Sequence, residues 1–163
     1  MIIEIMINLA GIFHKILVPI DGSKPADNAL GKALQLAKIH GSVVEVLHVM
    51  SVTEDLPTEP ERSEKTDTPS EWVEEYLNQI RKKDEKMLSE AMDEAKKMGL
   101  EGKVTSKLLI GKPEDAILRE ATLGAFDLIV IGDRGISGLK ELVLGSVSHQ
   151  VVDQSKIPVL VVK

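Results

Sequence analysis

The chain has 163 residues, of which 43% are hydrophobic and 28% are charged, a composition that predicts one globular domain with a sizeable core. It contains no cysteine, which excludes disulfide bonds, thiolate metal sites and cysteine nucleophiles and fits a reducing, cytoplasmic location. Twenty Lys and Arg residues against 26 Asp and Glu residues give a formal net charge of -6, and there are one Trp, one Tyr and two Phe. This acidic balance and the scarcity of aromatic side chains argue against a nucleic-acid partner and predict an aliphatic core.

The first 13 residues are apolar but do not have the pattern of a targeting segment. No basic residue precedes the apolar run, Glu4 and Asn8 interrupt it, and it is about half as long as a membrane-spanning helix needs to be. We therefore expect no membrane partner. We assign residues 1–13 to an N-terminal extension and residues 14–163 to the domain; the alternative is a translation start placed too far upstream.

The next part of the chain alternates short aliphatic runs with helical periodicity, a pattern typical of βα units and a mostly parallel sheet. Residues 16–20 are almost all aliphatic and predict a strand buried on both faces. A helix is expected from Ser23, whose hydroxyl can cap it, to His40-Gly41. Its expected inner face consists of Ala26, Ala29, Leu30, Ala33, Leu34 and Ala37. Residues 43–49 predict a second strand.

Residues 51–70 are rich in Pro, Glu, Thr and Ser and predict a mobile surface loop. The loop ends in Thr68-Pro69-Ser70-Glu71, a capping box that opens a long helix, and Gly99 closes that helix. Apolar residues recur along it at helical spacing: Val73, Leu77, Ile80, Met87, Leu88, Ala91, Ala95 and Met98.

The remaining elements complete the α/β pattern. Residues 104–110 alternate in polarity and predict a strand near the sheet edge, and a helix follows Pro113 and ends at Gly124. Further along are a strand at 128–131, a helix at 146–154 and a strand at 158–162. The chain is therefore expected to form an α/β domain with a five-stranded parallel sheet and helices on both faces.

Ligands of such sheets bind beyond the carboxyl ends of the strands, where the strand order reverses. The segment after the fourth strand is rich in glycine and is followed by Gly145-Ser146 at the start of a helix. Glycines let backbone N–H groups approach an anion, and a helix N-terminus adds unpaired donors and a positive dipole end. Ser146 and Arg134 could both contact a phosphate. The alternative is that the glycines only permit turns.

These residues resemble a known signature. Gly132-x2-Gly135-x9-Gly145-Ser146 is similar to the nucleotide-binding motif of the ATP-binding branch of the universal stress protein family. The segments at 18–23 (VPIDGS), 47–49 (LHV) and 157–162 (IPVLVV) resemble the first, second and last strands of that family. The resemblance covers residues 13–163 and implies a Rossmann-like fold of the adenine nucleotide alpha hydrolase type.

The resemblance implies that ATP is bound as a ligand, with or without Mg²⁺ or Mn²⁺, between the loop after the first strand and the glycine loop. The positions that it implies as nucleotide contacts are Pro19, Asp21, Val49, Ile131, Gly132, Arg134, Gly135, Gly145, Ser146, Val147 and Ser148. Asp133 departs from the family pattern, which more often has a small or neutral residue there. Unless its carboxylate points to water or holds the metal, it would weaken ATP binding.

Other chemistry is not indicated. The chain has no Walker A motif and no dinucleotide fingerprint, and His14, His40, His48 and His149 lack metal-ligand spacing. We expect His48 to be satisfied by the backbone, and Ser23 and Ser146 to serve as helix caps. No catalytic residue is assigned.

We therefore expect an ATP-binding regulatory or stress-response protein that hydrolyses ATP weakly at most. The alternatives are a slow ATPase or other nucleotide-processing enzyme, and a nucleotide-free dimeric interaction module. The resemblance places Pro158–Val162 at a sheet edge, where pairing with a second copy would satisfy the unpaired backbone groups. We expect a homodimer through this strand, with Met1–Phe13 as the competing interface and a monomer covered by that segment as a further alternative.

Overall fold

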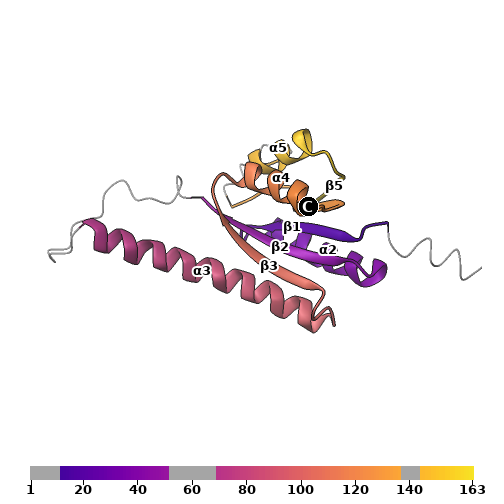
Figure 1. Ribbon diagram of the computed structural model, residues 1–163, viewed down its shortest axis with the longest axis horizontal. Helices are drawn as coiled ribbons and strands as arrows, with labels where there is room; N and C mark the ends of the chain where they lie inside the picture. Colours follow the sequence, from indigo (N-terminus) through magenta and orange to yellow (C-terminus); the bar gives the residue numbers. More distant parts are fainter. Residues whose placement is uncertain (1–11, 52–68, 137–143) are drawn as a thin grey trace, which may run out of the picture.

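The computed structural model describes residues 12–51, 69–136 and 144–163 (Figure 1). Its elements are, in chain order, β1 (Lys15–Ile20), α2 (Lys24–His40), β2 (Val43–Met50), α3 (Pro69–Lys97), β3 (Val104–Ile110), α4 (Pro113–Leu123), β4 (Leu128–Gly132), α5 (Ser146–Gln154) and β5 (Val159–Val162). The expected capping residue Thr68, most of the predicted loop at 51–70 and the segment 1–11 lie outside the described residues.

The five strands form one parallel sheet in the order β3-β2-β1-β4-β5, which confirms the predicted fold class. The strand order reverses between β1 and β4. β3 lies at one edge, as predicted, and β5 lies at the other. β5 begins at Val159 rather than Pro158, because Pro158 contributes only its carbonyl oxygen, which accepts a hydrogen bond from the Ile129 N–H.

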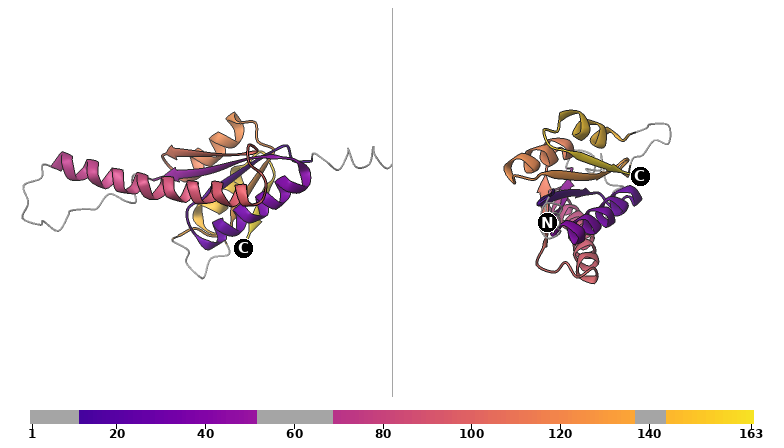
Figure 2. Two further views of the ribbon diagram at one scale, coloured as in Figure 1. Left: turned by 90° about the horizontal axis from the view of Figure 1, so that it is seen from below. Right: turned by 90° about the vertical axis from the view of Figure 1, so that its right-hand side faces the viewer.

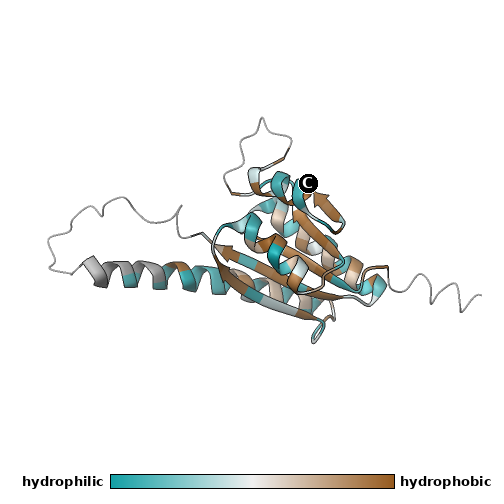
Figure 3. Cartoon of the chain, turned by 45° about the horizontal axis from the view of Figure 1, so that its top comes forward, coloured by the Kyte–Doolittle hydropathy of each residue, from teal (hydrophilic) through white to brown (hydrophobic). Residues whose placement is uncertain are grey.

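Helices cover both faces of the sheet, α2 and α3 on one and α4 and α5 on the other (Figure 2). Alternate strand residues such as Val18 and Val46 pack toward α2 and α3, while Leu17 and Leu47 pack toward α4 and α5. The strands are accordingly hydrophobic along most of their length (Figure 3). Apart from Phe126, the buried hydrophobic side chains of the described residues are aliphatic, which confirms the predicted core.

Helix α2 begins and ends as its sequence predicts. The Ser23 hydroxyl accepts a hydrogen bond from the Ala26 N–H, and Gly41 closes the helix in a left-handed conformation with φ of 76°. The predicted inner face is buried: Ala26, Ala29, Leu30, Ala33, Leu34 and Ala37.

Helix α3 is the longest element, and its first turns extend past the strands (Figure 2). Leu88, Ala91 and Ala95 are buried at the predicted helical spacing, while the side chains of Val73 and Leu77 lie outside the described part. Within the described residues no helix, α3 included, is long and apolar enough to cross a membrane.

Candidate functional site

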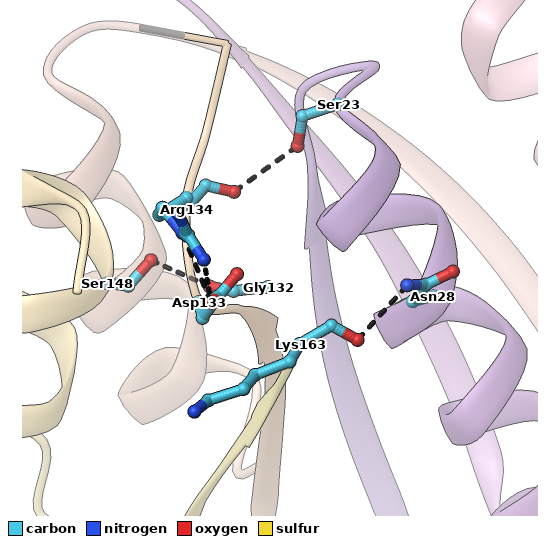
Figure 4. A network of polar contacts seen from close by, with 7 residues as sticks. All are labelled: Ser23, Asn28, Gly132, Asp133, Arg134, Ser148 and Lys163. Carbon is cyan, nitrogen blue, oxygen red and sulfur yellow. Dashed lines mark hydrogen bonds and ion pairs between the residues drawn. The ribbon is translucent and has the colours of Figure 1, made fainter. Parts of the chain in front are cut away.

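Two loops meet at the carboxyl ends of β1 and β4, the point at which the strand order reverses. The loop after β4 contacts the N-cap of α5, because the Gly145 N–H donates to the Asp133 carbonyl oxygen over 2.8 Å. Ser23 joins the two loops by donating its hydroxyl to the Arg134 carbonyl oxygen over 3.3 Å (Figure 4). The fold therefore brings the predicted strand-one and glycine segments together.

Asp21 is the main polar link between these loops. Its Oδ1 accepts from the Ser23 N–H over 2.9 Å, and its Oδ2 accepts from the Ile136 N–H over 3.1 Å. A Cβ at Gly135 would lie 2.5 Å from Asp21 Oδ2, so any side chain here would push the carboxylate away from the Ile136 N–H. Each carboxylate oxygen has a second lone pair, which leaves capacity for a hydroxyl or amino donor of a ligand.

The N-terminus of α5 offers unpaired donors. Gly145, and not Ser146 as predicted, is the N-cap: its backbone is extended and its carbonyl oxygen accepts the first helical bond from His149. Ser146 is therefore the first helical residue, is exposed, and makes no capping bond. The N–H groups of Ser146, Val147 and Ser148 precede the first helical bond and so lack intrahelical acceptors. Together with the positive end of the helix dipole, this arrangement of donors suits an anion.

Asp133 does not point to water. It is 1% exposed, and its Oδ2 lies 3.2 Å from both Nε and Nη2 of Arg134 (Figure 4). Its Oδ1 is buried and has no hydrogen-bond partner among the described residues. The guanidinium of Arg134 is thus occupied by its neighbour, so attraction for an anion at this loop comes mainly from α5 and from backbone N–H groups.

The apolar members of the predicted set lie on the α4/α5 face. Pro19 and Ile131 are buried, while Val49 and Val147 are half-buried and pack against the cluster on that face. These side chains form an apolar wall beside the polar loops.

Two further predicted residues support the glycine loop from inside. Ser148 is 4% exposed and donates its hydroxyl to the Gly132 carbonyl oxygen over 2.7 Å. A Cβ at Gly132 would lie 2.8 Å from the backbone carbon of Pro25, so this glycine lets the N-terminus of α2 pack against β4.

Glu114 connects α4 to α5 close to the site. Burial favours its neutral form, yet hydrogen bonds from Lys112, from its own backbone N–H and from Gln150 lower the pKa of its carboxyl group. Lys112 Nζ lies 2.7 Å from Glu114 Oε1. Because Gln150 follows Ser146 by one turn, this carboxylate helps to fix the helix whose N-terminus offers the donors.

A groove of about 730 Å³ lies between α2 and α3, apart from these loops. Its charged lining residues are mixed in sign: Lys24, Asp27, Lys32, Glu90, Glu94 and Lys163. This mixture does not favour an anion, unlike the N-terminus of α5. In the part of the chain that the structure describes, no group of three or more His, Cys, Asp or Glu side chains is placed to hold a metal.

Sequence reasoning missed one partner near the site. The prediction that the backbone satisfies His48 is confirmed, since Nδ1 lies 2.8 Å from the Ile20 carbonyl oxygen. However, Nε2 also lies 3.2 Å from Oδ1 of Asp84 on α3. The available signal was an acidic residue on the apolar stripe of that helix, four residues from both Ile80 and Leu88.

Comparison with known proteins shows the family and the fold to which the chain is similar. The model of the universal stress protein family matches residues 12–163. Universal stress protein YxiE of Bacillus subtilis is 38% identical over 151 residues, which span 93% of this chain and 99% of that one. The structure of MJ0577 from Methanocaldococcus jannaschii is 33% identical with a TM-score of 0.68, covering 92% of this chain and 95% of that chain.

A universal stress protein from Archaeoglobus fulgidus, solved in complex with dAMP, is 25% identical with a TM-score of 0.61, covering 93% of this chain and 99% of that chain. These relatives have the same Rossmann-like arrangement of a parallel sheet between helices. Since the family model spans residues 12–163 and a relative above 30% identity covers 93% of the chain, the protein belongs to the universal stress protein family.

Proposed function

We propose that this protein binds an adenine nucleotide, with ATP as its ligand, and that binding is regulatory rather than catalytic. The observation that carries the proposal is the N-terminus of α5, which the Gly145–Asp133 hydrogen bond holds against the loop after β4 and whose first N–H groups, on Ser146, Val147 and Ser148, lack intrahelical acceptors. Such a helix N-terminus favours phosphate. The dAMP complex of the Archaeoglobus fulgidus relative supports an adenine nucleotide as the ligand class.

The arrangement suggests a direction for the nucleotide. The phosphates would lie at Gly145 and Ser146, the ribose near Asp21, and the base along the apolar wall formed by Pro19 and Val49. The half-buried carboxylate of Asp21 has oxygens that accept hydrogen bonds, which suits ribose hydroxyls and the adenine amino group but not phosphate.

A metal would be bound mainly by the nucleotide. Mg²⁺ and Mn²⁺ prefer oxygen ligands, and Oδ1 of Asp133 is a buried carboxylate oxygen without a partner among the described residues. Phosphate oxygens and water would supply the remaining ligands.

Isothermal titration of the full chain with ATP and AMP, each with and without Mg²⁺, tests this function. We expect ATP to bind more tightly than AMP, and Ser146→Ala to weaken ATP by about 3- to 10-fold because it removes one phosphate donor. Absence of heat with both nucleotides would support the nucleotide-free module. Release of ADP from bound ATP over hours would instead support the slow ATPase.

We also propose a homodimer through β5. The carbonyl groups of Pro158 and Val162 accept hydrogen bonds from Ile129 of β4 and from Asp133, which follows β4. The intervening Val159 and Val161 therefore direct their N–H and C=O groups away from β4. Leu160 is 40% exposed on the same edge. An edge of this kind is completed by an antiparallel copy about a two-fold axis.

A further inference from the structure

A buried pair of ionisable side chains, His48 and Asp84, lies on the sheet face opposite the apolar wall of the nucleotide site. Their side chains are 11% and 8% exposed, and Nε2 of His48 lies 3.2 Å from Oδ1 of Asp84. His48 projects from the same face as Val46, toward α3, whereas Val49 packs toward α4 and α5. The pair therefore connects α3 with the sheet without touching the proposed ligand.

The hydrogen-bond partners of His48 determine how many protons the pair holds. A carbonyl oxygen only accepts, so Nδ1, 2.8 Å from the Ile20 carbonyl oxygen, must carry a proton. Nε2 faces a carboxylate oxygen, and two lone pairs at 3.2 Å would repel each other. One proton must therefore lie between Nε2 and Oδ1, whether the pair is an imidazolium with a carboxylate or a neutral ring with a carboxylic acid.

The pair also fixes the peptide that precedes Asp21. In a trans peptide the N–H points opposite to the C=O, and the described residues contain no cis bond. Because His48 holds the Ile20 carbonyl oxygen, it sets the direction of the Asp21 N–H and the start of the loop. Asp21 in turn accepts from the Ile136 N–H across the site. An unbroken series of contacts thus runs from α3 through Asp84 and His48 to the glycine loop.

We propose that His48 and Asp84 are positioning residues that share a proton, hold the Ile20–Asp21 peptide, and thereby make nucleotide affinity depend on the contact between them. The dependence of affinity rests on the proposed function. The shared proton and the held peptide do not, and they can be measured in the free protein.

A purely structural role is the competing explanation, and α3 offers a matched control. Leu88 is buried one turn after Asp84 and is 7% exposed, and it packs on the sheet through apolar contacts alone. Leu88→Ala loosens α3 without removing a partner of His48. If the pair only anchors α3, Leu88→Ala and Asp84→Ala will have the same effect on the nucleotide loops.

Asp84→Asn is the conservative variant. Its amide nitrogen can donate to Nε2 of a neutral ring while Nδ1 keeps its proton for Ile20, so the link survives without the shared proton. Asp84→Ala removes the link. We therefore expect the asparagine to retain the geometry that the alanine loses.

The experiment combines nitrogen-15 NMR of the His48 ring, amide exchange at Ile136 and titration with ATP, all on the full chain. In the unmodified protein we expect Nδ1 to be protonated and a protected proton to be shared by Nε2. Asp84→Ala should speed exchange at Ile136 and weaken ATP by about 3- to 30-fold, whereas Asp84→Asn should stay within about threefold. Leu88→Ala should leave ATP affinity unchanged under conditions in which it is folded.

The proposal is overturned if the His48 ring of the unmodified protein carries its only proton on Nε2, a result that requires no variant to fold. It is also overturned if Leu88→Ala weakens ATP as much as Asp84→Ala does. If the unmodified protein binds no ATP, the proposed function fails, and the ring and Ile136 measurements still decide the positioning role.

Discussion

The two faces of the sheet use polar residues in opposite ways at the same ends of the strands. On the α4/α5 face, Ser146 is exposed, and among the described residues the first N–H groups of α5 have no intrahelical acceptor. On the α2/α3 face, His48 and Asp84 are buried and bonded to each other. Water satisfies an exposed donor cheaply, while a buried polar group needs a protein partner. A ligand site is therefore marked by donors that the fold leaves unpaired at its surface, and a positioning element by groups that it pairs inside.

Gly132 and Gly135 belong to one motif but contact different parts of the molecule, and substitution of Gly132 should have the larger effect on stability. Its missing Cβ leaves room for α2, since an added Cβ would lie 2.8 Å from the backbone carbon of Pro25. Backbone atoms of a helix cannot move aside cheaply, so we expect Gly132→Val to lower the free energy of unfolding by roughly 3 kcal/mol. Urea denaturation measures the change, and a loss below about 0.5 kcal/mol would contradict this packing role.

Replacement of Gly135 should affect ligand binding much more than the stability of the fold. An added Cβ would meet the carboxylate of Asp21 at 2.5 Å, which would break the link between the two loops. The effect is steric, because Gly135 does not have a positive φ. We expect Gly135→Val to weaken ATP binding by about 100-fold or more, with a stability loss of about 1 kcal/mol. Titration and urea denaturation of the same sample distinguish it from Gly132→Val, and unchanged ATP affinity would show that this loop does not bind phosphate.

The edge strand provides the next test, since β5 has a paired side and an open side. Val161→Pro removes an N–H that points away from β4, so we expect loss of the dimer with little change in the monomer fold. Leu160→Pro is the matched control, because its N–H points toward β4 and its loss should destabilise the fold. Light scattering gives the mass. A monomeric unmodified protein, or a fully dimeric Val161→Pro variant, would exclude this interface.

Most of the fold could be predicted from the sequence because its signals are local. The aliphatic runs predict the strands, and Ser23 and Gly41 determine the ends of α2 through contacts within a few residues. The glycine motif is also a local pattern, and it correctly predicted the loop that follows β4. At α5, one residue was misassigned: a serine beside a helix start suggests a cap, but the extended backbone of Gly145 makes that residue the N-cap.

The rest depends on contacts between segments that are distant in sequence. The pairing of Asp84 with His48 requires α3 to pack on β2 in one register. The bond from Ile136 to Asp21 likewise requires β1 and β4 to be neighbours. Sequence spacing identifies Asp84 as an acidic residue on the apolar stripe of α3, but only the tertiary structure shows that its partner is His48.

Asp133 tests whether a buried acid on the ligand side behaves differently from Asp84. Its unpartnered Oδ1 and its bond to Arg134 place a negative charge in the loop and occupy a nearby cation. Without metal, we expect Asp133→Asn to tighten ATP binding by about fivefold, because a unit charge a few ångströms away changes the energy by about 1 kcal/mol in a solvated site. AMP should gain less. If the carboxylate holds Mg²⁺, the variant will instead weaken metal-dependent binding of ATP. Titration with and without the metal separates these outcomes. Unchanged affinity under both conditions would show that Asp133 does not influence the bound nucleotide.

The smallest effect is expected far from the ligand, at Glu45 on β2. Burial raises the pKa of its carboxyl group, the negative Glu120 on α4 raises it further, and Lys107 and Lys15 oppose the rise in part.

Because this folded-state pKa lies above its ordinary value, the favourable contribution of the protonated form is complete below that value and is lost as pH rises through the folded pKa. The ionised carboxylate therefore weakens the fold at neutral pH. Glu45→Gln imitates the protonated form and should raise the free energy of unfolding at neutral pH by about 1 kcal/mol or less, with no difference near pH 4. Urea denaturation at the two pH values measures this difference, with the exposed Glu101→Gln as the control. An equal stabilisation at both pH values would mean that the gain comes from side-chain packing and not from removal of the buried charge.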